Sequence, residues 1–153
     1  MLFWQCFAAM TAVGIGSFFL GRLLPRRFFW VDCFPWRCYS WEREGKIYRR
    51  IFVHRWQRYL PDMSRILPGF IRPKRLEEDM DRCLPELIRE TCVAELIHWL
   101  LCPAGLLCRV IWPGTGGKVC ALLFMLGNLP YILVQRYNRP RLAALAHRRG
   151  IIR

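Results

Sequence analysis

The stretch RETCVAELIHW, residues 89–99, carries ionisable side chains directly into an apolar run that extends from Leu96 to Trp112. Such a run predicts a helix that crosses a bilayer once its start is extended back to residue 91. Glu95 and His98 then lie where the helix enters the membrane, and ionisable groups at that depth are functional candidates because they are costly to bury. A polar cluster that only holds helices together is the structural alternative.

A second apolar run, from Val119 to Val134, follows the linker PGTGGK at residues 113–118. The linker is rich in turn residues and is too short for any connection other than an antiparallel hairpin. The sequence therefore predicts a transmembrane helical hairpin with spans at residues 91–112 and 119–135.

The amino-terminal segment, residues 2–20, is also long and apolar enough to cross a bilayer. A cleaved signal peptide is the alternative, but no basic residue precedes the apolar run, and Arg22, Arg26 and Arg27 follow it. We therefore expect a retained amino-terminal anchor whose amino end lies outside the cell.

Charged residues are concentrated outside the three apolar segments. The section 21–90 holds most of the charges and many prolines, which predicts short helices and turns, and the tail 136–153 has six arginines and no acid. By the positive-inside rule both belong on the cytoplasmic side of the cell membrane. Residues 47–56 have the pattern of a basic amphipathic helix, which would lie either on the membrane or against the rest of the domain. The 153 residues form a single all-α membrane domain with several passes.

The chain carries a net charge of +13. That charge suits anionic lipids or acidic ligands such as coenzyme A or an acyl carrier protein. Nucleic acid is not expected as a partner, because most aromatic residues lie in or beside the apolar runs and no RNA-binding or helix-turn-helix signature accompanies them. The eight cysteines include no CxxC pair and are expected to be mostly reduced, although Cys33 and Cys38 would be able to pair in an oxidising compartment.

Polar side chains form one stripe on each helix of the predicted hairpin. The stripe on the first helix consists of Thr91, Glu95, His98 and Cys102, and the stripe on the second helix consists of Asn128, Tyr131, Gln135 and Asn138. Because the start of one helix lies opposite the end of the next, Glu95 and His98 are predicted to meet Gln135, Arg136 and Asn138 at the cytoplasmic membrane level. A carboxylate beside an imidazole usually orients a general base, so Glu95 and His98 are the candidate catalytic pair.

The step Glu95-Leu96-Ile97-His98 has the ExxH spacing of di-iron helical bundles. Such bundles need a second ExxH and further glutamates on facing helices, and the sequence has none that match. We therefore expect no metal and no bound cofactor.

The motifs of the hairpin resemble those of a known family. They are Glu90-Thr91 followed by AELIHW at residues 94–99, then NLP at 128–130 and VQRYNRPRL at 134–142. The pattern is similar to the glycosyl-4,4'-diaponeurosporenoate acyltransferase family, which completes staphyloxanthin-type carotenoids. The resemblance covers roughly residues 89–150 and, more loosely, the region of Gly45, Lys46 and Trp56, while the first 40 residues match only as an apolar anchor. It departs from the family at Val93, where a basic residue is expected.

The resemblance implies a membrane enzyme that esterifies a sugar hydroxyl of a glycolipid with a fatty acyl group. The expected catalytic residues are His98 as general base, Glu95 as its orienting carboxylate, and Glu90. The expected substrate-binding residues are Thr91, Trp99, Asn128, Gln135, Arg136, Tyr137, Asn138, Arg139 and Arg141. In this hypothesis an amide of Gln135 or Asn138 stabilises the oxyanion, and the arginines bind acyl-coenzyme A or an acyl carrier protein.

Two other functions are compatible with the sequence. The first is a non-catalytic membrane protein that binds lipid or a partner protein through its hairpin and its basic surface. The second is a lipid hydrolase that uses the same His98 and Glu95.

Overall fold

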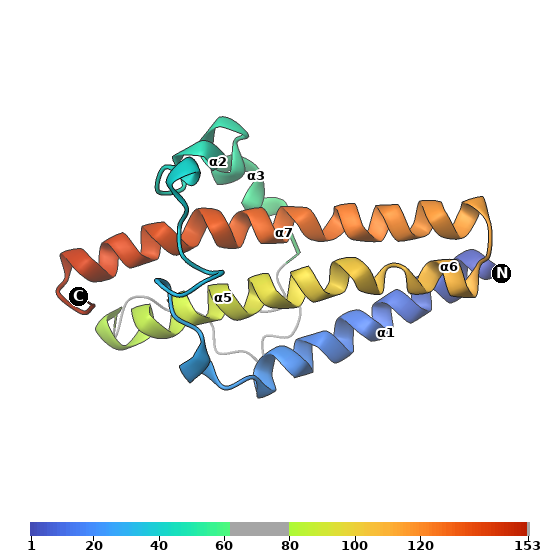
Figure 1. Ribbon diagram of the computed structural model, residues 1–153, viewed down its shortest axis with the longest axis horizontal. Helices are drawn as coiled ribbons and strands as arrows, with labels where there is room; N and C mark the ends of the chain where they lie inside the picture. The colour runs from blue at the N-terminus through green and yellow to red at the C-terminus, as the bar shows by residue number, and fades with distance from the viewer. Residues whose placement is uncertain (62–79, 153) are drawn as a thin grey trace.

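The computed structural model describes residues 1–61 and 80–152, and the secondary structure within them is helical. The elements are α1 (Leu2–Leu23), η1 (Arg26–Phe28), η2 (Ser40–Glu42), α2 (Lys46–Arg50), α3 (Val53–Trp56), η3 (Gln57–Tyr59), α5 (Met80–Ala104), α6 (Leu107–Ile111) and α7 (Thr115–Arg148). Three long helices, α1, α5 and α7, form the body of the molecule, and the short helices α2 and α3 lie beside α7 (Figure 1).

Three helical segments are long and apolar enough to cross a membrane. They are Leu2–Leu23, Arg82–Ile111 and Thr115–Arg148. At 1.5 Å per residue, the 22 residues of α1 extend about 33 Å, close to the thickness of a bilayer's hydrocarbon core. The predicted number of apolar helices and their order along the chain are therefore confirmed.

The predicted hairpin is formed by α5 and α6 on one side and α7 on the other, running in opposite directions (Figure 1). Its turn depends on glycine, because a Cβ on Gly117 would lie only 2.0 Å from the carbonyl oxygen of Trp112. The indole of Trp112 covers Gly116 in the same way. These contacts explain why the linker is rich in glycine.

The helix that carries the predicted second span starts earlier than that span and is interrupted within it. Helix α5 begins at Met80, not near residue 91, and contains Pro85. Pro85 is the sixth residue of α5 and has no N–H to donate to the carbonyl oxygen four residues earlier, so one backbone hydrogen bond is missing near the start of the helix. The span is interrupted at residues 105–106, where a Cβ on Gly105 would lie 3.0 Å from the carbonyl oxygen of Ala121. The rest of the predicted section of short helices, residues 62–79, lies outside the described residues.

Helix α7 contains both the predicted third span and most of the predicted basic tail. It continues through Pro130 and Pro140 to Arg148. The basic residues of the tail are therefore held on a continuous helix, directly past the apolar part of the hairpin.

Helix α1 packs against the hairpin through small side chains. Gly21 faces Ile97, whose Cγ1 would lie 3.2 Å from an added Cβ, and Cys6 and Met10 pack against Cys108 and the neighbouring part of α7. All eight cysteines fall within the described residues and are free thiols. The contact at Gly21 places the end of α1 at the level of residues 93–97 of α5.

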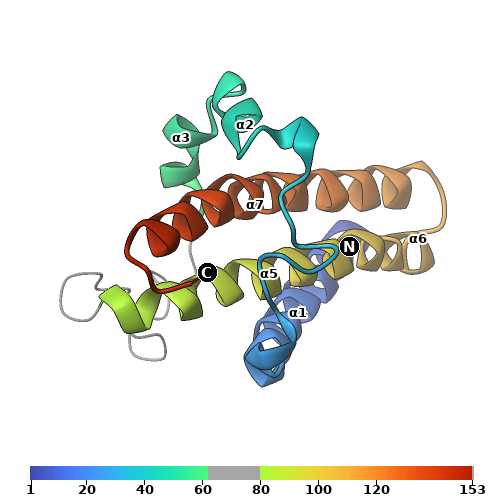
Figure 2. The same cartoon turned by 60° about the vertical axis from the view of Figure 1, so that its left-hand side comes forward.

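The predicted amphipathic helix at residues 47–56 is wrong. The chain forms two short helices, α2 and α3, separated by Ile51 and Phe52, and Phe52 adopts a left-handed conformation with φ of 56°. Tyr48 and Val53 pack on Tyr137 of α7. We refer to residues 46–59 as the α2–η3 unit. It lies along α7, on the opposite side from α1, in both views (Figures 1 and 2).

Candidate functional site

Four charged side chains are buried together where α5, α7 and the segment before α2 meet. Glu42, Glu95 and Arg139 are at most 2% exposed, and Arg136 is largely covered. We call Glu42, Glu95, Arg136 and Arg139 the four-charge cluster. Its two carboxylates and two guanidinium groups balance, which is the condition under which buried charges are tolerated.

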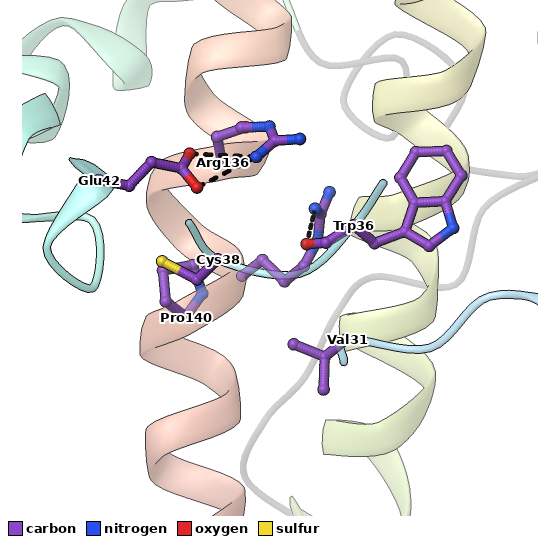
Figure 3. Close-up of a pocket in the computed structure, with 7 residues that line it drawn as sticks. Val31, Trp36, Cys38, Glu42, Arg136 and Pro140 are labelled. Atoms are coloured by element: carbon purple, nitrogen blue, oxygen red, sulfur yellow. Dashed lines mark hydrogen bonds and ion pairs between the residues drawn. The ribbon is translucent and has the colours of Figure 1, made fainter. Parts of the chain in front are cut away.

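Arg136 connects all three parts of the structure in this cluster. Its Nε donates to Glu95 Oε1 at 2.8 Å, and its Nη1 donates to both carboxylate oxygens of Glu42 at 3.1 and 3.2 Å. Its Nη2 donates to the carbonyl oxygen of Pro35 at 2.8 Å. The pair of Glu42 and Arg136 is visible in Figure 3. Charge-assisted bonds of this kind are among the stronger hydrogen bonds in proteins.

Arg139, one turn further along α7, also donates hydrogen bonds to several protein oxygens. Its Nε and Nη2 donate to the hydroxyl and carbonyl oxygens of Thr91, both at 3.0 Å. Its Nη1 donates to the carbonyl oxygen of Trp36 at 2.8 Å, and its Nη2 also donates to Glu95. The predicted contact between Glu95 and Arg136 is therefore found, whereas the contact between Thr91 and Arg139 was not predicted.

These contacts change the role expected for the arginines. Arg136 and Arg139 were predicted to bind the phosphates of an acyl donor, but their guanidinium groups are already held by protein oxygens. The cavity beside them, lined by side chains that include Trp36, Cys38 and Pro140, has a volume of only about 10 Å³ (Figure 3). That is about the space of one water molecule. Of the three arginines only Arg141 is exposed, and it donates to the hydroxyl of Tyr137 at 2.7 Å.

The imidazole of His98 lies between α5 and α7, with an amide on one edge and an aromatic ring on its face. Its Nδ1 is 2.9 Å from Oδ1 of Asn128, and its ring stacks on Tyr131 with centroids 4.5 Å apart. The amide nitrogen of Asn128 donates to the carbonyl oxygen of Phe124 at 2.8 Å, which fixes the direction of the amide. Oδ1 therefore accepts from Nδ1, and Nε2 of the neutral imidazole keeps its lone pair.

The partner expected for His98 was therefore the wrong residue. Glu95 accepts from Arg136, Arg139 and the indole nitrogen of Trp99, the last at 3.3 Å. A carboxylate with two guanidinium partners is better satisfied than one that faces a single imidazole. Glu90 lies eight residues before His98, about 12 Å along the helix axis, so α5 does not bring these two side chains together.

Two of the remaining predicted binding residues of α7, Tyr137 and Asn138, support the α2–η3 unit. The amide nitrogen of Asn138 donates to Oε1 of Gln57 at 3.2 Å, and the ring of Tyr137 is buried against Tyr48. Gln135 is half-buried on the same helix. Asn138 therefore uses one amide hydrogen on the α2–η3 unit, and we favour Gln135 as the amide candidate for an oxyanion.

Sequence reasoning missed the residues that complete the four-charge cluster from the segment before α2. Glu42 accepts from the backbone nitrogen of Tyr39 at 2.7 Å and from the hydroxyl of Tyr48. Gly45, which follows it, has φ of 82° and lies so close to Pro140 that a Cβ would be 3.2 Å from its Cγ.

The structure gives no indication of a metal centre in the residues it describes. No group of three or more histidine, cysteine, aspartate and glutamate side chains is placed there to hold an ion. Buried side-chain nitrogen and oxygen atoms in the same residues all have hydrogen-bond partners.

The three helices that are long and apolar enough to cross a membrane, with a buried charge cluster and a histidine–amide pair between two of them, define the class as a small helical protein of membrane type. Comparison with known proteins identifies its family. The chain belongs to the glycosyl-4,4'-diaponeurosporenoate acyltransferase family, whose model matches residues 25–148. The resemblance noted in the hairpin motifs is therefore confirmed and extends into the segment before α2.

Two relatives with that name come from Staphylococcus aureus. The protein of strain N315 is 30% identical over 131 residues, which cover 82% of this chain and 76% of the relative. The protein of strain USA300 is 30% identical over 130 residues with the same coverage. No solved structure matches the chain significantly.

Proposed function

We propose that this protein transfers a fatty acyl group to a sugar hydroxyl of a membrane glycolipid, with His98 as the general base. The observation that carries the proposal is the contact between His98 and Asn128, because it leaves Nε2 as the basic nitrogen of the imidazole. The family name supports an acyltransferase that acts on a glycosyl carotenoid. The glycosyl group supplies the hydroxyl that a base would activate.

In this mechanism Nε2 of His98 takes the proton from the sugar hydroxyl as its oxygen attacks the carbonyl carbon of an acyl thioester. The carbon–oxygen bond forms, and the carbonyl oxygen becomes an oxyanion. When this intermediate collapses, the carbon–sulfur bond breaks and the imidazolium returns its proton to the departing thiolate. Base catalysis of this kind contributes roughly 10² to 10⁴-fold. Gln135 is the candidate donor to the oxyanion.

Asn128 takes the orienting role that the sequence favoured for Glu95. An asparagine performs it in cysteine proteases with a Cys-His-Asn arrangement, where it holds the imidazole in its useful tautomer. The four-charge cluster positions the two helices that carry the pair. Glu95 is three residues from His98 on α5, and Arg136 is eight residues from Asn128 on α7, so their ion pair constrains the register of the hairpin.

We further propose that all three apolar helices cross the cell membrane and that the end holding the four-charge cluster faces the cytoplasm. The arginines that follow α1 and those at the end of α7 support this orientation. The apolar part of the acceptor would lie between lipid and helices, with its sugar at the level of His98. The donor would be acyl-coenzyme A or an acyl carrier protein, which reach the protein from the cytoplasm.

The test is acyl transfer to a glycosyl carotenoid in membranes that contain the protein, followed by mass spectrometry of the lipids. We expect His98→Ala to lower the rate by about 10² to 10⁴-fold. Asn128→Leu is expected to lower it by about 10-fold, the effect of roughly 1.4 kcal/mol in tautomer and orientation. His147→Ala, which changes an exposed histidine near the end of α7, is the matched control.

Two results would decide against the mechanism. Undiminished transfer by a stably produced His98→Ala protein would exclude His98 as the base. Release of free fatty acid that does not depend on the acceptor would indicate a lipid hydrolase.

A further inference from the structure

The turn between α2 and α3 exposes two large apolar side chains. Ile51 is 50% exposed and Phe52 is 52% exposed, although both lie in a strongly charged part of the chain. Phe52 also holds a left-handed backbone conformation, which is unusual for a bulky residue and is therefore a sign of a functional constraint. The strained conformation and the exposure occur at the same residue.

The charges around this turn are all of one sign. Residues 46–58 contain five lysines and arginines and no acidic residue: Lys46, Arg49, Arg50, Arg55 and Arg58, all of them exposed. The guanidinium group of Arg55 lies over the ring of Phe52, 5.1 Å from its centroid. An exposed apolar pair flanked by arginines is typical of segments that lie in a membrane interface.

The position of the α2–η3 unit along the bundle follows from a chain of contacts. The end of α1 meets α5 at Gly21 and Ile97, and Glu95 on the same turn of α5 pairs with Arg136 of α7. The next residues of α7, Tyr137 and Asn138, hold the α2–η3 unit. The unit therefore lies at the level where the first apolar helix ends and its basic residues begin.

The unit also projects sideways from the bundle. In Figures 1 and 2, α2 and α3 stand out from the flank of α7 that is opposite to α1. If the long helices cross a bilayer, an element that extends sideways at the level where α1 ends lies over the surrounding lipid, in the headgroup layer. The apolar turn is then surrounded by phosphates.

We propose that the Ile51–Phe52 turn is an interfacial anchor that inserts between the headgroups of anionic phospholipids. Phe52 and Ile51 reach the boundary of the acyl chains, and Arg49, Arg50 and Arg55 bind the lipid phosphates. The positive charge of the segment makes an anionic leaflet the favoured surface. The proposal depends on the membrane orientation of the bundle and not on His98 or on acyl transfer.

The experiment places a nitroxide spin label on the turn of the full-length protein in bilayer nanodiscs. Cys33 and Cys38, the two exposed cysteines, are replaced by serine, and Phe52→Cys is labelled in that background. The matched control is Glu44→Cys, an exposed position close to the unit but away from its apolar turn. Labelling of the background protein without the new cysteine gives the signal to subtract.

Collision rates with oxygen, which concentrates in lipid, and with a water-soluble nickel chelate then report the depth of each label. In bilayers that contain phosphatidylglycerol, we expect the ratio of oxygen to nickel collisions at residue 52 to exceed that at residue 44 several-fold. The ratio at residue 52 should fall in bilayers of phosphatidylcholine alone. Ile51→Cys provides a second reading if the label at residue 52 prevents folding.

Two outcomes would overturn the proposal. Equal access of the nickel chelate to residues 52 and 44 would show that the turn faces water, as it would if its natural partner were another protein. Equal depth in the two lipid compositions would show that anionic headgroups are not what the arginines bind. Neither outcome depends on whether the protein transfers acyl groups.

Discussion

The four-charge cluster makes a specific prediction for paired substitutions of Glu95 and Arg139. Glu95→Gln leaves one carboxylate for two buried guanidinium groups, and Arg139→Met leaves two carboxylates for one guanidinium group. Each single variant therefore buries an unbalanced charge. The double variant keeps only the neutral pair of Glu42 and Arg136, whose contacts are 3.1 to 3.2 Å.

The magnitudes follow from the contacts that each change removes. Breaking a buried ion pair by removing one partner costs about 3 to 5 kcal/mol, and Glu95→Gln belongs in this range. Arg139→Met breaks the same ion pair and also removes three hydrogen bonds to the oxygens of Thr91 and Trp36, each with a net value of about 1 kcal/mol, so we expect it to cost more than Glu95→Gln. Because the double variant restores charge balance, we expect it to lose about 2 kcal/mol less than the sum.

The measurement is the free energy of unfolding of the full-length protein in detergent micelles, followed by tryptophan fluorescence during titration with a denaturing detergent. Arg141→Met removes an exposed arginine from the same helix and should change the free energy very little. If the effects of the two single changes add to within about 0.5 kcal/mol, the carboxylate of Glu95 and the guanidinium group of Arg139 are not coupled. Charge balance would then not be what stabilises the four-charge cluster.

Two further predictions concern how the segment before α2 is held on α7. Gly45→Ala should destabilise the packing of the α2–η3 unit on α7 by about 1 to 2 kcal/mol, because the new Cβ meets Pro140 and the residue has a positive φ. Tryptic cleavage at the arginines of the α2–η3 unit should then become faster, without a change at Arg141. Burial, and then the hydrogen bond to Glu42, raise the pKa of Tyr48 above its ordinary value of 10.0. Because the pKa is raised, the stabilisation that the neutral Tyr48 hydroxyl contributes is present below pH 10 and is lost as the pH rises beyond it. The difference in free energy of unfolding between the native protein and Tyr48→Phe should therefore shrink above pH 10. A difference that stays constant with pH would contradict this role of Tyr48.

Periodicity and hydropathy were sufficient to predict the main helices. The hairpin follows from two apolar runs and a linker too short for any other connection, and the meeting of the two polar stripes follows from the antiparallel arrangement. Helix ends were predicted less well. Pro85 favours a boundary in the sequence, but α5 continues through it. The second span is interrupted just after Pro103, at residues 105–106, where Gly105 lies close to the carbonyl oxygen of Ala121.

The partners within the site could not be predicted from spacing along one helix. Glu95 and His98 share a face of α5, which made them look like a pair, but each bonds to α7 instead: Glu95 to two arginines and His98 to Asn128. The pairing of Glu95 with two arginines requires Glu42, whose carboxylate adds the second negative charge that two buried guanidinium groups need. Glu42 lies in a section with no periodic pattern, so periodicity gives no signal for its position.

The two groups of polar residues have different requirements, and this difference explains why they are separate. A base must keep an unoccupied nitrogen, so a neutral amide such as that of Asn128 suits His98 because it fixes the tautomer without adding charge to the apolar region. Charged groups must instead be fully paired to be buried, and Glu95 has both oxygens occupied. A carboxylate engaged in this way can hold α5 and α7 in register below the imidazole. It follows that loss of Asn128 should act on the rate of acyl transfer while loss of Glu95 acts first on folding, so the two substitutions separate chemistry from architecture within a single hairpin.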